Sequence, residues 1–372
     1  MSADKNSGKK GVSSPQESTA LSQSNGLANL LKSIGVSIAF TSYQSHILYL
    51  LGVKDGGGCH IHQSSIHRPM GLFANQGEFY LASGYQISHF ANNLTNGQRA
   101  NQIFTGCYVA RTVHNIGSVD AHDIGIDRNG QIIFVNTRYN CLATIDPRHS
   151  FREIWRPSFI SALVAEDRCH LNGLAMDNGE AAYVTAVSRS DTIDGWRDRR
   201  HGGGIIIDVR TNQIICDGLS MPHSPRMHQG ELWVLNSGTG ELGVVEGAST
   251  GKGRFVPRVF CPGFTRGLAM RGKYAFVGLS RPRYQRFEGL PLDQRLLDTD
   301  SEPWTGIQII DLSTGSCVDW LRMDGPVAEI YDVALLDDQC AMAVTGDSPD
   351  IKSLVTIAPQ NAPTDRRQII AA

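Results

Sequence analysis

The sequence predicts an all-β protein, a six-bladed β-propeller in which an N-terminal strand closes the last blade. Three observations lead to this prediction. A two-strand unit recurs along the chain, and the second strand of each copy carries a large residue. These large residues follow one another at intervals of 43 to 66 residues, which is the period of a propeller blade with loop insertions. Turns rich in Gly and Asn join the strands within each unit.

The elements can be justified in chain order. After a short helix in GLANLLKSIG, the first strands of the units are HRPMGLFA, AHDIGID, HLNGLAMD, HSPRMH, TRGLAMR and YDVALLD. The large residues of the second strands are Tyr80, Phe134, Tyr183, Trp233, Phe276 and Met342. In the last blade we expect SLVTIAP to form a strand and residues 37–51 to lend another. Such a closed ring leaves no open sheet edge to aggregate.

The domain organisation follows from composition. Residues 1–25 are rich in Ser, Lys, Gly and Gln, which predicts a disordered tail. Residues 26–365 are expected to form a single propeller domain. A boundary near residues 202–204 between two domains is the alternative, but the repeated unit continues through that point.

Charge and cysteine content exclude several classes of function. The 372 residues carry a formal net charge of −2, so no overall field favours nucleic acid or an anionic membrane. No apolar run reaches the roughly 18 residues of a membrane span, and no signal pattern is present. Eight cysteines occur without a CxxC pair, which favours buried free thiols, Cys169 among them, in a reducing cytoplasm.

The repeat predicts which residues gather at one mouth of the central channel. Aligned units place Met70, His122, Asn172, His223, Arg266 and Tyr331 at one level. Two residues earlier, on the same strand face, stand Arg68, Asp120, His170, Met221, Phe264 and Glu329. Asp332 is an alternative for the sixth position, because the last unit has an extra residue before its turn. The histidines of CHIHQSSIHRP precede the first blade, and we expect them on the surface.

Roles can be assigned to this polar set by chemistry. The predicted catalytic residues are His122, His170, His223, Tyr331 and Asp123. The predicted substrate-binding residues are Arg68, Asn172, Arg226, Arg266, Asn136, Arg138, Asn236, Arg283 and Trp304. Arginine is prominent because its planar fork binds carboxylates and phosphates. Two long insertions, SRSDTIDGWRDRRHGGG and RPRYQRFEGLPLDQRLLDTDSEPWTG, are expected to act as lids over the mouth.

Long motifs in this chain resemble a known family. FISALVAEDRCHLNGLAMDNG, GLSMPHSPRMHQGELWVLNSGTGELG, PGFTRGLAMRGKYAFVGLS and EIYDVALL closely resemble a bacterial family of conserved hypothetical proteins, a domain of unknown function that is predicted to be propeller-like. This resemblance implies the fold and assigns no activity.

A weaker resemblance is to the six-bladed propellers of the gluconolactonase and regucalcin type. In those proteins an Asn directly before the Gly of a strand binds the catalytic divalent metal, and Asn172 is similar. His122 stands where their second metal-binding segment has Asn, and HRPMGLF lacks their glutamate ligand. The resemblance therefore implies a different and more histidine-rich site.

Three hypotheses of function follow. The first is an enzyme with one divalent metal, Fe(II) or Zn(II) rather than Ca²⁺ or Mg²⁺, held by His122, His170, His223 and Glu329. It would be a lyase, hydrolase, cyclase or oxygenase acting on an anionic metabolite. The second is a metal-free lyase or cyclase of a biosynthetic pathway that uses histidines and Tyr331 as acids and bases. The third is a propeller that binds a ligand or a protein without catalysis. We expect no nucleotide cofactor and no nucleic-acid or membrane partner, and the oligomeric state stays open.

Overall fold

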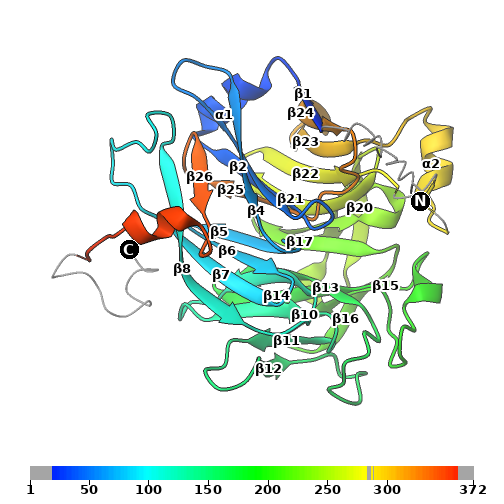
Figure 1. Cartoon of the computed structure of the whole chain (residues 1–372). Coiled ribbons are helices and arrows are strands. Elements are labelled where there is room, and N and C mark those ends of the chain that lie inside the picture. The colour runs from blue at the N-terminus through cyan, green and yellow to red at the C-terminus, as the bar shows by residue number, and fades with distance from the viewer. Residues whose placement is uncertain (1–18, 283–285, 288, 359–372) are drawn as a thin grey trace, which may run out of the picture.

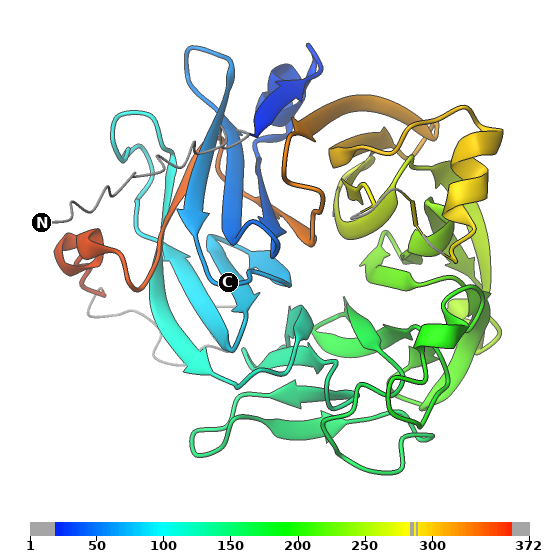
Figure 2. The same cartoon turned by 45° about the vertical axis from the view of Figure 1, so that its right-hand side comes forward.

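A computed structural model describes residues 19–282, 286–287 and 289–358. Its strands form six small sheets arranged in a ring around a central channel (Figures 1 and 2). The predicted six-bladed β-propeller is therefore confirmed. Only two α-helices occur in the described part, α1 (Leu27–Ile34) and α2 (Leu292–Asp298).

Each blade is a sheet of four strands that begins at the channel and runs outward. From the channel outward, blade 1 consists of β5 (Leu72–Asn75), β6 (Glu78–Ser83), β7 (Gln86–Asn92) and β8 (Gly106–Asn115), and blade 2 of β9 (Ala121–Ile126), β10 (Ile132–Asn136), β11 (Cys141–Thr144) and β12 (Arg152–Trp155). Blade 3 consists of β13 (Leu171–Asp177), β14 (Glu180–Ala186), β15 (Gly204–Asp208) and β16 (Gln213–Leu219), and blade 4 of β17 (Pro222–His228), β18 (Glu231–Asn236), β19 (Glu241–Glu246) and β20 (Arg254–Phe260). Blade 5 consists of β21 (Phe264–Arg271), β22 (Tyr274–Ser280), β23 (Thr305–Asp311) and β24 (Ser316–Asp324), and blade 6 of β25 (Asp332–Leu336), β2 (Ser37–Ser42), β3 (Ile47–Val53) and β4 (Cys59–Ser65).

Blade 6 closes the ring with strands from both parts of the chain. Its inner strand β25 pairs with β2, and β3 and β4 complete the sheet. The N-terminal part thus supplies three strands instead of the one expected. The described part of SLVTIAP, residues 353–358, forms no strand, because its first residue ends a 3₁₀ helix and residues 354–358 have no regular structure.

The segment around Met342 is also not the second strand of blade 6, as the repeat suggested. It forms β26 (Ala341–Val344), which leaves that blade and pairs in parallel with β8 of blade 1. Ala341, Ala343 and Val344 are buried there. After β25, the last strand that the chain contributes to blade 6, the chain therefore adds a fifth strand to the outer edge of blade 1.

Part of the segment predicted to be a tail, residues 1–25, is ordered. Strand β1 (Ala20–Gln23) pairs with β24 at the outer edge of blade 5, because its backbone finds the free edge of that sheet. Residues 1–18 of the predicted tail and residues 359–365 of the predicted domain lie outside the described residues. No domain boundary exists at residues 202–204, since β15 begins there in the same sheet as β13 and β14.

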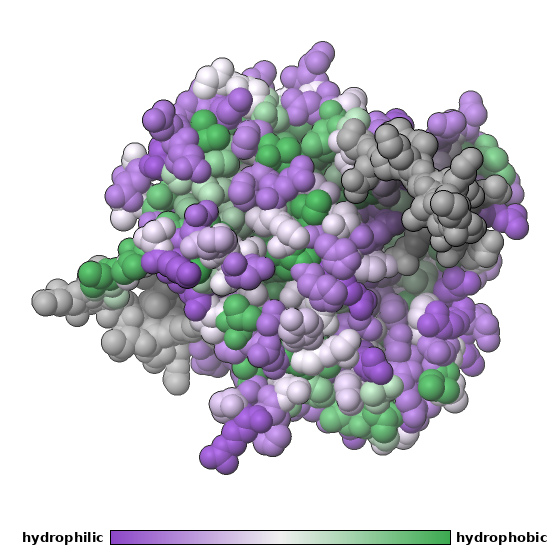
Figure 3. All heavy atoms as spheres, in the orientation of Figure 1, coloured by the Kyte–Doolittle hydropathy of each residue, from purple (hydrophilic) through white to green (hydrophobic). Residues whose placement is uncertain are grey.

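Hydrophobic side chains from neighbouring sheets hold the blades side by side. Tyr80 and Ile87 of blade 1 pack with Ile124 and Phe134 of blade 2 in one buried cluster. Similar clusters lie between the other blades. On the face in Figure 3, hydrophilic residues are interspersed with isolated hydrophobic ones. The blade contacts therefore form the core, and they fix the inner strands around the channel.

Both long insertions lie at the end of the channel where the inner strands begin. Each connects the second and third strands of a blade, β14 to β15 and β22 to β23. Since the second strand runs antiparallel to the inner strand, it ends beside the start of that strand. We call this end of the channel the mouth. No described helix is long and apolar enough to cross a membrane.

Candidate functional site

Four residues at the mouth have left-handed backbone conformations although none is glycine. They are Arg68 (φ 48°), Asp120 (φ 51°), His170 (φ 52°) and Met221 (φ 50°), at equivalent positions just before the inner strands of blades 1 to 4. Bulky residues rarely adopt this conformation, and such outliers cluster at functional sites. Here the conformation turns the carbonyl groups of Asp120 and Met221 toward a histidine two residues later.

His122 is held in one tautomer by two oxygen atoms. The Thr137 hydroxyl donates to the carbonyl of Leu171 (2.6 Å), so its oxygen is left to accept from His122 Nδ1 (2.7 Å). The Asp120 carbonyl lies 2.9 Å from the same nitrogen. Both oxygens require a proton on Nδ1. The neutral ring therefore carries a free electron pair on Nε2.

His223 repeats this arrangement two blades further on. The Ser237 hydroxyl donates to the carbonyl of Thr265 (2.6 Å) and lies 3.1 Å from His223 Nδ1. The Met221 carbonyl is 2.8 Å from that nitrogen. On the other side of the ring, Nε2 faces the amide nitrogen of Asn172 at 3.4 Å. His223 is only 3% exposed, so it lies behind the accessible part of the mouth.

The imidazole of His170 is oriented by different contacts. Its Nδ1 lies 2.8 Å from a carboxylate oxygen of Asp167. The Trp196 ring from the blade 3 insertion stacks on the imidazole at 4.2 Å between centroids. The ring of His170 meets that of His122 edge to face, with centroids 5.0 Å apart. Both histidines are partly exposed, which makes them the accessible pair of the site.

Arg266 contributes a positive charge beside this pair. Its guanidinium carbon lies 3.6 Å from the centre of the Tyr331 ring, and that ring is 5.5 Å from the ring of His122. No described carboxylate forms an ion pair with Arg266. The Tyr331 hydroxyl is buried without a hydrogen-bond partner among the described residues. Arg266 is half-buried. Because no described carboxylate pairs with it, its guanidinium is available to an anion.

Burial and Arg266 together set the protonation of the mouth. Burial lowers the pKa of His122 well below its usual range, and the charges of Arg266 and His170 lower it further. Burial and Arg266 lower the pKa of His223 in the same way. Burial raises the pKa of the Tyr331 hydroxyl. His122 and His223 are thus neutral at physiological pH, and Tyr331 keeps its proton.

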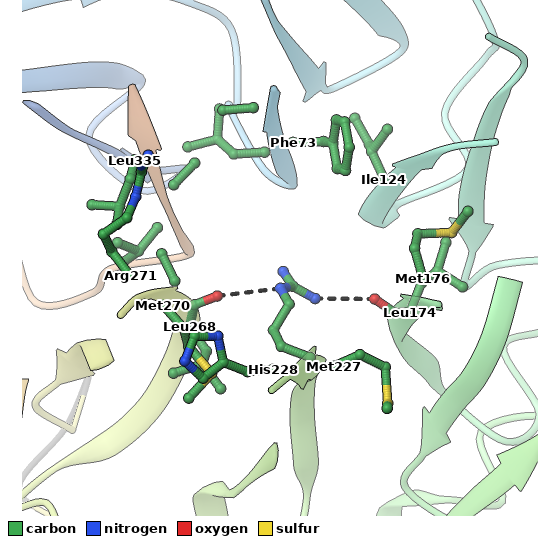
Figure 4. A pocket seen from close by; sticks show the side chains of 16 residues that line it. Phe73, Ile124, Leu174, Met176, Met227, His228, Leu268, Met270, Arg271 and Leu335 are labelled. Atoms are coloured by element: carbon green, nitrogen blue, oxygen red, sulfur yellow. Dashed lines mark hydrogen bonds between the residues drawn. The ribbon is translucent and has the colours of Figure 1, made fainter. Parts of the chain in front are cut away.

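Asp123 and Arg226, predicted as catalytic and substrate-binding residues, lie deeper in the channel and pair with each other. Arg226 Nη1 donates to Asp123 Oδ2 at 2.7 Å, and Nη2 donates to Oδ1 at 3.2 Å. The guanidinium also donates to the carbonyls of Leu174 (3.0 Å) and Leu268 (3.2 Å), the two bonds drawn in Figure 4. These contacts join blades 2, 3, 4 and 5.

Asp332 completes this ionic cluster and brings in the remaining blades. Its Oδ1 lies 3.7 Å from Arg226 Nη2. Its other oxygen accepts from the backbone nitrogen of Leu72 in blade 1 at 2.7 Å. Asp123, Asp332 and Arg226, which we call the channel cluster, thus contact all six inner strands. Their hydrogen bonds are satisfied within the channel.

Beyond the channel cluster, a chamber of about 310 Å³ opens at the end opposite the mouth. Its walls come from the later halves of the inner strands, and most of the residues that line it are apolar, as Figure 4 shows for Phe73, Ile124, Met176 and Met270, while Arg226, His228 and Arg271 add polar groups. The channel cluster therefore separates this chamber from the mouth.

Other predicted site residues lie away from the mouth pair. Asn136 and Asn236 are buried and accept from the backbone nitrogens of Tyr139 and Ser220. Arg138 is exposed. Trp304 lines a separate groove with Pro262 and Trp320. Arg68 is at the mouth, where it pairs with Asp120 at 3.5 Å, and Arg283 lies outside the described residues.

Sequence reasoning missed several residues of the site. Thr137 and Ser237, which orient the two buried imidazole nitrogens, follow Asn in the parallel motifs VNT and LNS. That repetition was a usable signal. Asp167, the partner of His170, had no such signal, because a loop places it there. Trp196 was seen only as a lid residue, whereas it stacks directly on His170.

The predicted metal ligands do not converge in this structure. The three histidines each direct Nδ1 at an oxygen, as metal-binding histidines do. Nε2 is left free in His122 and His170, whereas Nε2 of His223 faces the amide nitrogen of Asn172 at 3.4 Å. Within residues 19–282, 286–287 and 289–358, however, no three His, Cys, Asp or Glu side chains are placed to hold a metal ion. The charge of Arg266 also disfavours a nearby cation. A metal bound by His122, His170, His223 and Glu329 stays a prediction.

The cysteines agree with the prediction of free thiols. All eight are unpaired, and six of them, including Cys169, are buried. Burial raises the pKa of the Cys169 thiol, which keeps it protonated and unreactive. Of the histidines expected on the surface, His67 is exposed, whereas His60 and His62 lie on β4 and are half-buried.

Solved structures similar to this chain are propellers of low sequence identity. The nidogen/laminin complex has 12% identity and a TM-score of 0.49, covering 82% of this chain and all of that one. A streptogramin B lyase has 10% identity and a TM-score of 0.41, covering 89% and 93%. Virginiamycin B lyase from Staphylococcus aureus has 11% identity and a TM-score of 0.40, covering 83% and 100%. Similarity at this level says nothing about the reaction.

Sequence comparison assigns the family but no activity. No curated protein matches the chain. A family model matches residues 25–344, a span that begins just before α1 and ends with β26 and therefore includes all six blades. The chain belongs to the family of the domain of unknown function DUF4915.

Proposed function

We propose that this protein is an enzyme that carries out acid–base chemistry on a small anionic molecule at the mouth, as a lyase or cyclase. The observation that carries the proposal is the accessible pair of His122 and His170, 5.0 Å apart and held in different ways, beside the unpaired guanidinium of Arg266. Two titratable groups whose surroundings differ in this way are typical of an acid and a base that act together.

The surroundings of each histidine suggest its role. His122 is neutral and has a free Nε2, so it suits the general base. His170 shares a hydrogen bond through Nδ1 with the Asp167 carboxylate, which fixes the ring with Nε2 available to a leaving group, so it suits the general acid. In an elimination, His122 would take a proton from the carbon next to the anionic group. The electron pair would expel a leaving group from the neighbouring carbon, and His170 would protonate it.

Arg266 would hold the anionic group of the substrate. A guanidinium without a carboxylate partner binds carboxylates or phosphates through two parallel hydrogen bonds. The lid residue Trp196 would keep His170 in place, and the buried His223 and Asn172 would support the floor of the site. The channel cluster would close the site from below.

This proposal can be tested without knowing the natural substrate. A panel of β-substituted carboxylates in D₂O should include members that exchange their α-hydrogen or lose the β-substituent, as followed by proton NMR. His122→Ala and His170→Ala should each slow this reaction by about 10²–10⁴-fold. His149→Ala, which removes an exposed histidine far from the mouth, is the matched control. Saturable binding without turnover would instead favour a binding protein.

A metal-dependent enzyme is the second candidate, and what favours it is the orientation of His122 and His170, whose Nδ1 atoms face oxygens while Nε2 is free. His122, His170 and His223 would hold the ion through Nε2, and the ion would polarise a substrate carbonyl. Metal analysis after anaerobic purification with added Fe(II) or Zn(II) tests this candidate. A stoichiometric metal that is lost in His122→Ala and His223→Ala would support it.

A further inference from the structure

A second groove lies on the mouth face, between blades 6 and 1, and has a volume of about 650 Å³. Blade 6 contributes residues 46 and 65–67 to its walls, and blade 1 contributes residues from β6, β7 and β8. Residues 345–347, which follow β26, close the outer end. None of the residues that line this groove belongs to the mouth pair or to the channel cluster.

Three rings form an ordered, exposed surface in this groove. The ring of His67 lies between those of His46 and Tyr85, with centroids 5.3 and 6.2 Å away. His46 Nδ1 accepts from the backbone nitrogen of Arg68 at 3.0 Å, so the neutral ring carries its proton on Nε2. A Cβ atom at Gly84 would lie 2.6 Å from the ring of His67. The glycine therefore makes room for an imidazole that would otherwise be displaced.

The rest of the groove offers uncharged hydrogen-bonding groups at high density. Hydroxyl groups come from Ser65, Ser88 and Thr345, and none of these three forms a side-chain hydrogen bond with another described residue. Gln86 donates from its amide nitrogen to Asn115 and keeps its carbonyl oxygen for a ligand. The lining includes the carboxylate of Asp347 and no Lys or Arg.

We propose that this groove is a binding site for a neutral saccharide of one or two rings. An exposed face of rings packs against the C–H surface of a sugar, and short hydroxyl, amide and carboxylate side chains match its hydroxyl groups as donors and acceptors. The absence of Lys and Arg among the lining residues and the presence of Asp347 disfavour an anion. The volume suits a small molecule of this size.

The saccharide site is independent of the proposed reaction. Arg68 lies between the two places: its backbone contacts His46 in the groove, and its side chain pairs with Asp120 at the mouth. A sugar in the groove would thus lie next to the mouth without contacting the mouth histidines. Binding in the groove would attach the protein to a saccharide, or a glycosylated ligand to the protein. The reaction at the mouth does not need these contacts.

The test is a binding experiment on the full chain with glucose, galactose, mannose, N-acetylglucosamine, maltose and cellobiose as probes, followed by saturation-transfer NMR and calorimetry. We expect at least one probe to bind. Tyr85→Ala removes one ring of the surface, and Gly84→Val displaces the ring of His67. Each substitution should weaken that binding about tenfold or more. Tyr139→Ala, which removes a half-buried ring from blade 2, should leave it unchanged.

His122→Ala serves as the second control, because it affects the mouth only and should not change saccharide binding. Binding that is lost in His122→Ala and retained in Tyr85→Ala would overturn the proposal, since the sugar would then occupy the mouth. So would a complete lack of binding across the panel. None of these outcomes bears on whether carboxylates react at the mouth.

Discussion

At the scale of single residues, the mouth depends on hydroxyl groups that join one blade to the next. Thr41 donates to the carbonyl of Met70, Thr137 to that of Leu171 and Ser237 to that of Thr265. Each hydroxyl lies at or just past the end of a second strand and reaches the start of the inner strand of the following blade. In blades 2 and 4 the same oxygen also accepts from a histidine. One side chain thus fixes both the spacing of blades and the tautomer of an imidazole.

We expect Thr137→Val to destabilise the protein by about 1–2 kcal/mol, because valine has the same shape and leaves the Leu171 carbonyl and His122 Nδ1 without this buried partner. Thr137→Ser should restore most of the loss. Urea denaturation measures the stability, and ¹⁵N NMR of the His122 ring measures the proton on Nδ1, which should exchange faster in the valine variant. The same substitution at Thr112 in β8, whose hydroxyl has no side-chain bond in the described part, should cost little. Equal effects at both positions would contradict this role.

At the scale of elements, the repeat made the inner strands and the second strands of blades 1 to 5 predictable, because large residues recur at blade spacing. β1 and β26 were not predictable in the same way. Each has four residues and pairs with a strand that is distant in sequence, so local pattern does not specify its partner. Arg226 illustrates the same limit within the site. The register of β17 against β18 shifts between His223 and Arg226, and this bulge directs Arg226 into the channel, which alternation alone does not show.

The blade 3 insertion, residues 187–203, is held to the mouth by Trp196. Its ring lies between His170 (4.2 Å) and the guanidinium of Arg197 (4.6 Å). Trp196→Ala should therefore loosen the insertion and raise the rate of tryptic cleavage after Arg197, Arg199 or Arg200 about tenfold, since loss of the stacked ring costs about 1.4 kcal/mol or more of local stability. Mass spectrometry of timed digests identifies the cleavage site.

Two variants make this experiment decisive. Trp196→Phe keeps an aromatic ring on His170 and should retain most of the protection. Trp320→Ala removes a tryptophan from blade 5, far from the insertion, and should leave cleavage there unchanged. If Trp196→Ala is cut as slowly as the wild type, other contacts hold the insertion and Trp196 is not its anchor.

At the scale of the whole molecule, the channel cluster joins the six blades at the axis, where the hydrophobic clusters between adjacent blades do not reach. Two carboxylates share one guanidinium there. Both carboxylates are buried, and the guanidinium is partly exposed to the chamber. Burial lowers the pKa of Arg226, but the charges of Asp123 and Asp332 more than offset this, so its pKa is raised. Burial also raises the pKa of Asp332, to about 7. The cluster is thus sensitive to both composition and pH.

We expect Arg226→Met to destabilise the protein by about 3–5 kcal/mol at pH 8, because it leaves two buried carboxylates without a counter-charge. The loss should shrink as the pH falls from 8 to 5. The reason is that burial raises the pKa of Asp332 to about 7 although the charge of Arg226 lowers it, so the pKa of this carboxyl is higher still in the variant. Below the pKa of the wild type the folded Asp332 is neutral in both proteins and needs no counter-charge, and the difference in stability grows as the pH rises through about 7. Urea denaturation of wild type and variant at both pH values measures this difference.

Arg254→Met, which breaks an exposed ion pair with Glu246, should change stability by less than about 1 kcal/mol at either pH. A loss for Arg226→Met that is as small as this control, or that is the same at pH 5 and pH 8, would mean that the six blades are held by their hydrophobic contacts alone.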